Sequence, residues 1–314
     1  MQQKFRIGTA LSGLALFAAV IAAEPLLQSL PDRQARPPAV ALLEFAPAGF
    51  AAADWAPLLL VDAWRVTSRD PRVGGVSALA VDGDELVAVT DTGAVLQFPK
   101  AIRPQLRTRV RDLPSGPGDE RFKMNRDSEA IARDPDNRGW WIAFENRDEL
   151  WLYDWGFARA LQRVVVPRER MSLNAGIEGL ASGKGGLLAF PESGGSALSW
   201  SSGRWGEARV EPRTPLSDAV RLDDGSVLLV ERRLTATGFS NVLALVRADG
   251  ATFRTVWRKR LPVGRRDNVE ALAAERTDGG GYRLWMMTDD NFHPRLRTVL
   301  LVVDIPAGLV RKQA

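Results

Sequence analysis

The sequence predicts an all-β protein, a six-bladed β-propeller made of four-stranded antiparallel blades. Three observations carry this prediction. After about residue 39, short apolar runs alternate with turns rich in Asp, Asn and Gly, as in LAVDGDELVAVTDTG, which is the pattern of successive β-hairpins. Amphipathic helical periods are nearly missing. One motif also recurs five times, at spacings of 40 to 52 residues, which is the length of a propeller blade.

The first residues differ in character from the rest of the chain. Lys4 and Arg6 precede an uncharged apolar stretch from 7 to 23 that ends in small residues. This pattern predicts a secretory signal peptide over residues 1–23 and a periplasmic or secreted protein. The alternative is an uncleaved anchor in the inner membrane formed by residues 7–23, a length at the short limit for a span. Residues 24–39 are expected to form a linker, and residues 40–310 a single propeller domain.

Each repeat has two polar landmarks. It opens on a small or polar pair followed by a carboxylate or serine, and 13 to 19 residues later a strand ends in an acidic residue. The opening residues are Ser77, Glu129, Glu178, Asp218 and Glu270, and the closing residues are Asp91, Glu145, Glu192, Glu231 and Asp289. Because a hairpin returns to the level where it started, both sets are expected at one end of the ring.

The ends of the domain are expected to close the ring. The strand at 58–67 is predicted to pair with the strand at 297–305 and to form a shared sixth blade. Such pairing removes the free sheet edges that would otherwise aggregate. A seven-bladed ring and an open sandwich are the alternatives.

Composition excludes several kinds of chemistry. The chain has no cysteine and one histidine, so thiolate nucleophiles and zinc sites of the usual ligand set are excluded. No G-x-S-x-G elbow and no phosphate-binding glycine loop occurs. His293, in a loop before a proline, is expected to be a solvated surface residue. The net charge of +4 is spread along the chain, so we expect no nucleic-acid partner. We also expect a monomer.

Carboxylates are the functional groups that these exclusions leave as candidates for a reactive or metal-binding site. The innermost strand of each blade lines the channel, so Glu129, Glu178, Asp218 and Glu270 are expected to converge there with Asn268. Asp127, Asn174 and Asp267 lie beside them in sequence. Like charges so close need a counter-charge. Ca²⁺, which takes six to eight oxygen ligands, supplies one, and salt bridges to arginines that tie the blades together are the alternative.

The remaining polar residues are assigned to catalysis and to substrate binding. Glu145 or Glu231 is expected to take a proton, and Arg232 to hold an anionic group through two hydrogen bonds. A local Glu231–Arg232 ion pair is the alternative for those two. Arg126, Arg266, Asp91 and Asp289 are assigned to binding a small anionic or ester substrate.

Several of these segments together resemble the phytase-like propeller family, also described as "esterase-like activity of phytase". They include GIEGLAS, SDAVRLDDGSVLLVERRL and DNVEALAAERTDGGGYRLWMMTDDNF, and the matching pieces extend from about residue 74 to 305. The resemblance implies an exported six-bladed propeller with esterase or phytase action. The best-known propeller phytases are calcium-dependent and more acidic than this chain, which has 42 Lys+Arg against 38 Asp+Glu.

We therefore expect a hydrolase of carboxylic or phosphoric esters that depends on a divalent metal. Two alternatives stay open. One is a propeller without catalysis that binds a ligand or a protein on its channel face, and the other is a calcium propeller with lactonase chemistry.

Overall fold

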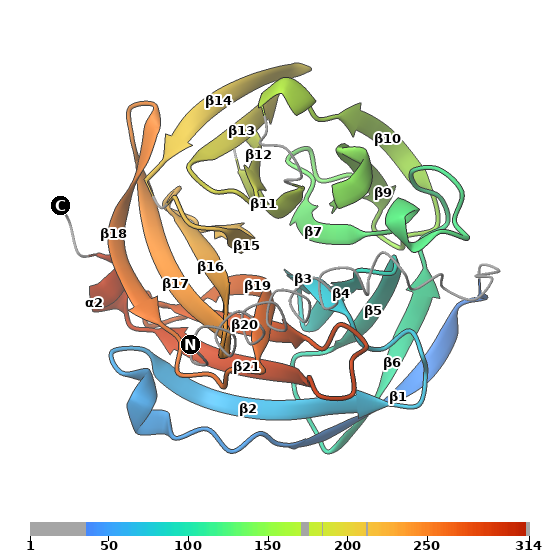
Figure 1. Ribbon diagram of the computed structural model, residues 1–314, viewed down its shortest axis with the longest axis vertical. Coiled ribbons are helices and arrows are strands. Elements are labelled where there is room, and N and C mark those ends of the chain that lie inside the picture. Colours follow the sequence, from blue (N-terminus) through green and yellow to red (C-terminus); the bar gives the residue numbers. More distant parts are fainter. Residues whose placement is uncertain (1–35, 171–175, 184, 212, 312–314) are drawn as a thin grey trace, which may run out of the picture.

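The computed structural model describes residues 36–170, 176–183, 185–211 and 213–311. The predicted signal peptide or anchor, most of the predicted linker and Asn174 lie outside these described residues. Within them, antiparallel sheets stand around a central axis like the blades of a propeller (Figure 1). No helix of the described residues is long and apolar enough to cross a bilayer.

Five blades, each starting with a strand at the axis, make up the described ring. From the axis outward, blade 1 contains β3 (Val76–Asp82), β4 (Glu85–Thr90), β5 (Ala94–Pro99) and β6 (Gln105–Asp112). Blade 2 contains β7 (Ser128–Arg133), β8 (Gly139–Phe144), β9 (Glu149–Asp154) and β10 (Ala160–Val165). Blade 3 contains β11 (Ile177–Gly183), β12 (Gly186–Pro191), β13 (Ser196–Ser201) and β14 (Arg204–Val210).

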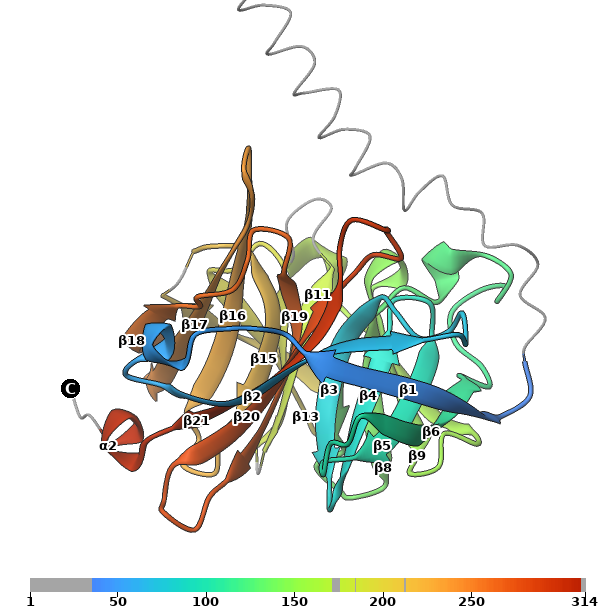
Figure 2. The same ribbon diagram turned by 90° about the horizontal axis from the view of Figure 1, so that it is seen from below.

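The last two blades complete the ring. Blade 4 contains β15 (Leu216–Arg221), β16 (Val227–Thr235), β17 (Gly238–Asp249) and β18 (Thr252–Arg260). Blade 5 contains β19 (Asn268–Arg276), β20 (Tyr282–Asp289), β21 (Thr298–Ile305) and β2 (Leu59–Ser68). β1 (Ala39–Pro47) pairs with both β2 and β6 and so joins blades 5 and 1 at their outer edges. Figure 2 shows β1 and β2 wrapped around the outside of the ring.

Short helices lie in the connections. They are the 3-10 helices η1 (Ala52–Trp55), η2 (Lys123–Asn125), η3 (Glu145–Arg147) and η4 (Arg168–Arg170), and the α-helix α2 (Ala307–Val310).

The expected closure between the chain ends is present, but the number of blades differs from the prediction. β2 pairs antiparallel with β21, with Trp64 opposite Leu300. This pair completes the fifth blade, because the C-terminal part supplies only β19, β20 and β21 and needs a fourth strand from the N-terminal part. No described strands remain for a sixth blade.

The core supports the count of five. Buried apolar side chains form five clusters in the described residues, and each cluster fills the space between two neighbouring blades. Blades 1 and 2, for example, share the cluster that contains Val87, Ile142 and Tyr153. Apolar burial therefore stabilises the ring at every blade interface, and the inner strands are held close to one another around the axis.

Candidate functional site

A β-bulge opens the inner strand of every blade. In each inner hairpin the pairing register shifts by one residue near the start of the strand, and the residues left without a partner are Ser77, Glu129, Glu178, Ser217 and Glu270. A bulge re-aims the side chain of its extra residue. The five bulges therefore repeat one side-chain direction around the axis, and in three blades that position carries a glutamate.

A second position faces the first from the end of the next strand. Its backbone N–H donates to the carbonyl two residues before the bulge: Asp91 to Gly75 at 2.8 Å, Glu145 to Asp127 at 3.0 Å, and Glu192 to Gly176 at 2.9 Å. In blade 4 the residue with this hydrogen bond is Arg232, which donates to Pro215 at 2.9 Å. In blade 5, Asp289 lies opposite Asn268. The opening and closing positions thus share one end of the ring, which we call the mouth end.

In blade 4 the observed opening and closing positions each differ by one residue from the predicted ones. The bulge position is Ser217 rather than Asp218, and the closing position is Arg232 rather than Glu231. Side chains alternate between the two faces of a strand, so a shift of one residue sends a side chain the other way. Asp218 and Glu231 therefore do not join the glutamates at the axis.

Asp218 and Glu231 have structural partners instead. Asp218, 2% exposed, accepts hydrogen bonds from the backbone N–H of Ala219 at 2.7 Å and of Leu272 at 2.5 Å, and so ties blade 4 to blade 5. Glu231, also 2% exposed, pairs with Arg258 on the outer strand β18, whose Nε lies 2.8 Å away, and accepts the hydroxyl of Thr214. Neither carboxylate is free to hold a channel metal or to take a proton from a substrate.

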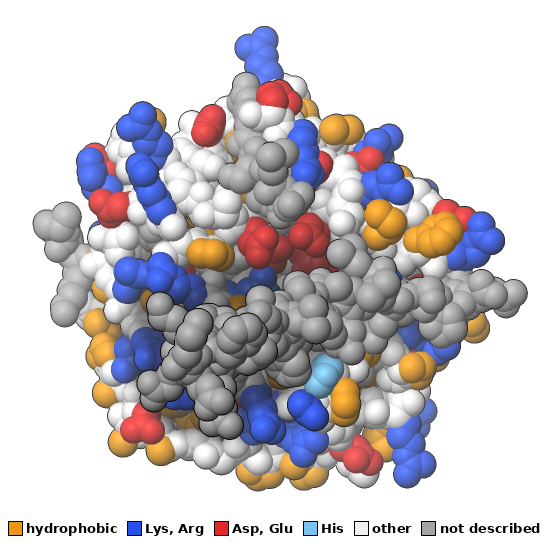
Figure 3. All heavy atoms as spheres, viewed as in Figure 1, with side chains coloured by type: hydrophobic (Ala, Val, Ile, Leu, Met, Phe, Trp, Pro, Cys, Tyr) orange, Lys and Arg blue, Asp and Glu red, His pale blue; other side chains and the backbone are white. Residues whose placement is uncertain are grey.

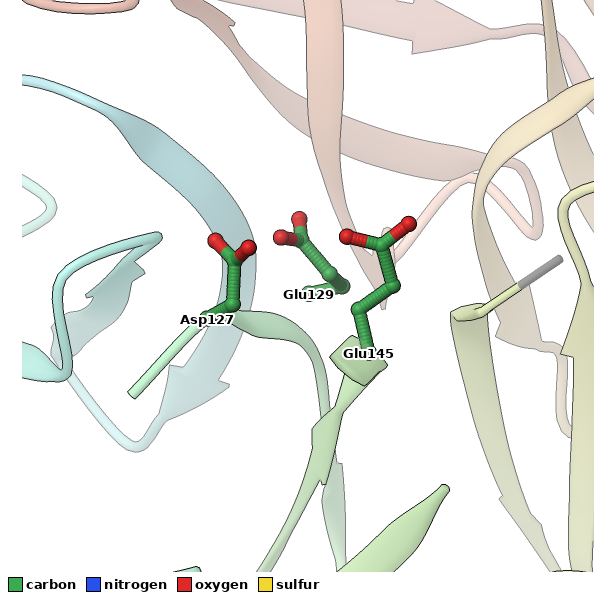
Figure 4. Close-up of side chains that lie close together, drawn as sticks. All are labelled: Asp127, Glu129 and Glu145. Carbon is green, nitrogen blue, oxygen red and sulfur yellow. The ribbon is translucent and has the colours of Figure 1, made fainter. Parts of the chain in front are cut away.

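Five carboxylates gather where blades 2 and 3 meet the axis. Asp127, Glu129 and Glu145 form one triplet, and Glu145, Glu178 and Glu192 form another, with one oxygen of each residue within 4.8 Å of the others in its triplet. Figure 4 shows the first three side chains extending in a similar direction, with their carboxylates close together. We call these five residues the carboxylate cluster. Figure 3 shows acidic side chains near the middle of the mouth face and basic side chains around part of its edge.

Two cations flank the cluster. On one side the Nζ of Lys123, in η2, lies 2.9 Å from carboxylate oxygens of both Asp91 and Asp127. On the other side Arg232 pairs with Glu270 and, at 3.2 Å, with Glu192. Both ends of its guanidinium are therefore bound to carboxylates within the site. The structure records no hydrogen bond or ion pair from another described residue to Glu129 or Glu178.

Burial and mutual repulsion hold protons on these groups. Burial, followed by the charges of neighbouring carboxylates, raises the pKa of Glu129 well above its ordinary value. Burial also raises the pKa of Glu178 well above the usual range, against the opposing effect of Arg232. The pKa values of Glu145, Asp91 and Asp289 rise to about 7, with burial as the largest cause in each case. Two flanking cations are too few to keep all of these carboxylates ionised.

The residues present fit a hard cation. The donors are carboxylate and amide oxygens, the ligands that Ca²⁺ and Mg²⁺ prefer. Two buried oxygens at the mouth ends of blades 1 and 5, Asp91 Oδ1 and Asn268 Oδ1, have no hydrogen-bond partner among the described residues. A Cβ built on Gly176 would overlap the side chain of Glu145, so only glycine leaves that carboxylate its place.

The other predicted residues lie at the edge of the site or outside it. Glu270 accepts Asn268 Nδ2 at 2.7 Å and pairs with Arg232, and Asp289 is buried and accepts the N–H of Asn291 at 2.6 Å. Arg126 is buried and donates to the carbonyl of Pro117 at 2.6 Å, away from the cluster. Arg266 is exposed before β19.

Sequence reasoning missed Lys123. It belongs to the connection between blades 1 and 2, outside the repeating hairpins, so no periodic pattern marks it. Asp127 was expected only as a neighbour of the ligands, and Glu192 only as a strand end. Asp127 lies two residues before the bulge of blade 2, and Glu192 occupies the closing position of blade 3.

The raised pKa values predict how stability depends on pH. Asp91, Glu145 and Asp289 titrate near 7 in the folded chain and near 4 in the unfolded chain. The native state therefore binds more protons between these values, and the free energy of unfolding falls as pH rises through this window. Without metal, urea unfolding should show a protein at least about 2 kcal/mol more stable at pH 5 than at pH 8, because even one carboxyl with a pKa raised from about 4 to about 7 contributes that much. Equal stability at the two pH values would contradict the raised pKa values of these three carboxyl groups.

Fold and site together define an all-β propeller with an acidic mouth. The chain belongs to the phytase-like family, described as "esterase-like activity of phytase", whose model matches residues 71–292. None of the curated proteins matches the sequence.

Solved structures are similar to the chain at low sequence identity. Myxococcus xanthus glutaminyl cyclase is 11% identical, with 79% of this chain and 96% of that chain covered and a TM-score of 0.50. Kuenenia stuttgartiensis hydrazine synthase is 12% identical at a TM-score of 0.41, with 70% of this chain and 58% of that chain covered. A putative 6-phosphogluconolactonase from Bacteroides fragilis is 13% identical at a TM-score of 0.39, with 84% and 80% covered. The chain thus spans little more than half of the hydrazine synthase chain. At these identities the likeness concerns the fold alone.

Proposed function

We propose that the protein is an exported, divalent-metal-dependent hydrolase of carboxylic or phosphoric esters that acts at the channel mouth. The carboxylate cluster is the observation that carries this proposal: two triplets share Glu145, and their oxygens lie within 4.8 Å. Among the described residues, the cations that form ion pairs with the cluster are Lys123 and Arg232. A divalent cation is the counter-charge that such a donor set favours. The family description, with its esterase-like activity, agrees with this chemistry.

The residues divide into ligands and a proton acceptor. Asp127, Glu129, Glu178 and Glu192 would hold the cation, and Ca²⁺ is the ion that we expect from the sequence. When bound, such an ion polarises a carbonyl or phosphoryl oxygen and lowers the pKa of water. Glu145 belongs to both triplets, so its carboxylate lies beside the proposed ligands, where it would accept a proton from water and return it.

The reaction needs one water molecule. The water oxygen bonds to the acyl carbon or to phosphorus while the bond to the alcohol oxygen breaks. Glu145 takes a proton from the water and gives it to the departing alkoxide, which leaves as the alcohol.

Exposed arginines support an anionic substrate. Arg233, Arg265 and Arg266 lie at the mouth end of blades 4 and 5 and are exposed. The carbonyl of Arg265 accepts the N–H of Phe239 at 2.8 Å, so the loop that carries Arg265 and Arg266 is held against the β16–β17 hairpin. These guanidiniums can meet a carboxylate or phosphate of the substrate. Arg266 thus keeps its predicted role in the proposal, whereas Arg126 is replaced by this group.

Export and a monomeric state complete the proposal. Export to the periplasm or the outside rests on the basic and apolar pattern of residues 1–23, with anchoring by residues 7–23 as the alternative. The expected partner is a small anionic or ester substrate, with no nucleic acid.

The test is hydrolysis of p-nitrophenyl acetate and p-nitrophenyl phosphate by the full chain. With Ca²⁺ or Mg²⁺ present we expect turnover of at least one ester, a loss of about 100-fold or more after chelation, and recovery when the cation is restored. The exposed Glu207 on β14 provides the control, since Glu207→Gln should leave turnover unchanged. Hydrolysis that survives complete chelation would refute the metal mechanism. Cation binding without turnover of any ester or lactone would favour the binding propeller, and lactone opening alone would favour the lactonase.

A further inference from the structure

A pocket, separate from the carboxylate cluster, lies at the end of the ring opposite the mouth. β19 and β20 place Asn268 opposite Asp289 at the mouth end, and Arg276 opposite Tyr282 at the other end. A cavity of about 370 Å³ opens beside this second pair, and Arg247 and Arg311 also line it. Figure 2 shows α2 and the β19–β20 hairpin at one end of the ring and the β20–β21 connection at the other. We call this cavity the rear pocket.

The rear pocket is built from two blades and a helix. Arg247 comes from β17 of blade 4, Arg276 and Tyr282 come from blade 5, and Val310 and Arg311 come from the end of the chain after β21. The N–H groups of Arg247 and Trp257, both in blade 4, donate to the carbonyls of Val310 at 3.0 Å and Leu309 at 3.1 Å. These bonds hold α2 against blade 4 and so place Arg311 near Arg247.

The charge of the rear pocket is opposite to that of the mouth. Its lining contains three guanidiniums and one carboxylate, Asp224, which lies 3.5 Å from Arg247. Arg276 has one long ion pair, 3.8 Å to Asp223, and both side chains are about 60% exposed. Among the described residues, no ion pair to Arg311 is recorded. Arg276 and Arg311 therefore keep N–H groups available for a bound oxyanion, whereas Arg247 uses its Nε for Ser226 and its Nη2 for Val310.

A hydroxyl adds a further donor. Tyr282 OH accepts the N–H of Asp223 at 3.3 Å, so its own proton remains free to be donated. Burial, together with the nearby charge of Asp223, raises the pKa of Tyr282, which keeps the hydroxyl protonated. The phenol body is buried, which fixes the position of the oxygen.

Space is kept for Arg311 by a glycine. Gly280 has a φ of +76°, and a Cβ there would lie 3.2 Å from Arg311 Nη2. A larger residue would be strained in this conformation and would push the guanidinium away from its place in the pocket.

We propose that the rear pocket binds a small molecule or ion that carries a phosphate or carboxylate group. Arginine suits these groups because its planar fork matches two oxygens at once. The volume is at the small end of the range for ligand sites, which favours a compact anion over a polymer. The proposal does not depend on the proposed hydrolase activity, since the two sites share no residue and lie at opposite ends of the strands.

Calorimetric titration with inorganic phosphate and, separately, with succinate tests the proposal. The full chain is first freed of metal with chelator and then titrated in chelator-free buffer, so that neither a metal at the mouth nor the carboxylates of the chelator contribute. We expect saturable binding of at least one anion at one equivalent per chain, and the stronger of the two identifies the preferred group. Arg276→Gln should weaken binding about tenfold, the usual effect of losing one charged hydrogen bond. Arg311→Gln, on a different element, should do the same.

Two matched variants serve as controls. Arg254 on β18 is 59% exposed and pairs with an aspartate, as the 60% exposed Arg276 does, so Arg254→Gln should bind as the unmodified chain does. Arg266→Gln distinguishes the two ends of the ring, because an anion held by the arginines at the mouth would be lost in this variant and kept in Arg276→Gln. The proposal is overturned if neither anion binds, if Arg276→Gln and Arg311→Gln both bind normally, or if Arg266→Gln alone weakens binding.

Discussion

Replacing Glu178 by glutamine is expected to abolish cation binding at the mouth and to reduce metal-dependent ester hydrolysis by about a thousandfold. Glu178 is 6% exposed and occupies the bulge position of blade 3. Its carboxylate belongs to the second triplet, and glutamine keeps the shape but removes the charge. Charge count sets the affinity of oxygen-ligand sites for hard cations, and loss of the ion removes several kcal/mol of transition-state stabilisation.

The same substitution should have opposite effects on stability with and without metal. The pKa of Glu178 is raised in the folded chain, above all by burial, so its ionised form destabilises the native state at neutral pH. In chelator at pH 7.5, Glu178→Gln should therefore melt at or above the temperature of the unmodified protein. With Ca²⁺ the unmodified protein should gain stability through binding to the native state, whereas the variant should not.

This reversal separates a metal site from a structural salt bridge. If Glu178 served only to pair with an arginine and tie blades together, its loss would lower the Tm in chelator as well. Glu207→Gln, on the exposed face of β14, should change the Tm in neither condition. A lower Tm of Glu178→Gln in chelator, together with unchanged binding of Ca²⁺, would remove Glu178 from the ligand set.

The hairpins and the closure of the ring could be predicted because their causes are local. Alternating apolar residues and Asp or Gly turns determine each hairpin, and the chain ends supply the strands that lack partners. The number of blades depends instead on how the strands at the two ends of the domain are divided among the blades. The strand at 58–67 pairs with 297–305 as expected, but blade 5 already needs it as its fourth strand.

The site was harder to predict, because a bulge changes which residue faces the axis. Glu129, Glu178 and Glu270 are followed by Ala or Gly in the inner strands. In blade 4 the acidic residue Asp218 stands at this following position and Ser217 at the bulge. The prediction aligned the blades by their acidic residues and so grouped Asp218 with the glutamates. Aligning Ser217 in LSD with Ser77 in VSA instead would have predicted the observed bulge position. The position of Lys123 near the cluster depends on the path of the connection between blades 1 and 2, and the repeating hairpins do not predict that path.

Arg232→Met should be the most destabilising single change at the mouth. Arg232 is 20% exposed at its side chain and lies between Glu192 of blade 3 and Glu270 of blade 5, while its own strand belongs to blade 4. Removing one partner of a buried ion pair leaves uncompensated charge and costs about 3–5 kcal/mol. In chelator this should lower the Tm by about 10 °C. Arg233→Met, on the exposed neighbour in the same strand, provides the matched control and should have little effect.

Two further variants show whether charge or geometry matters at this position. Arg232→Lys keeps the charge but cannot reach two carboxylates with one planar fork, so its Tm should lie between those of the other two proteins. The double variant Arg232→Met/Glu270→Gln removes the stranded carboxylate and should recover part of the loss, because the two residues are coupled. Ca²⁺ should also raise the Tm of Arg232→Met more than that of the unmodified chain, since a bound cation replaces the missing charge. If Arg232→Met melts like Arg233→Met in chelator, Arg232 is not the counter-charge of the cluster, and the charge that holds blades 3, 4 and 5 around the mouth must come from another group.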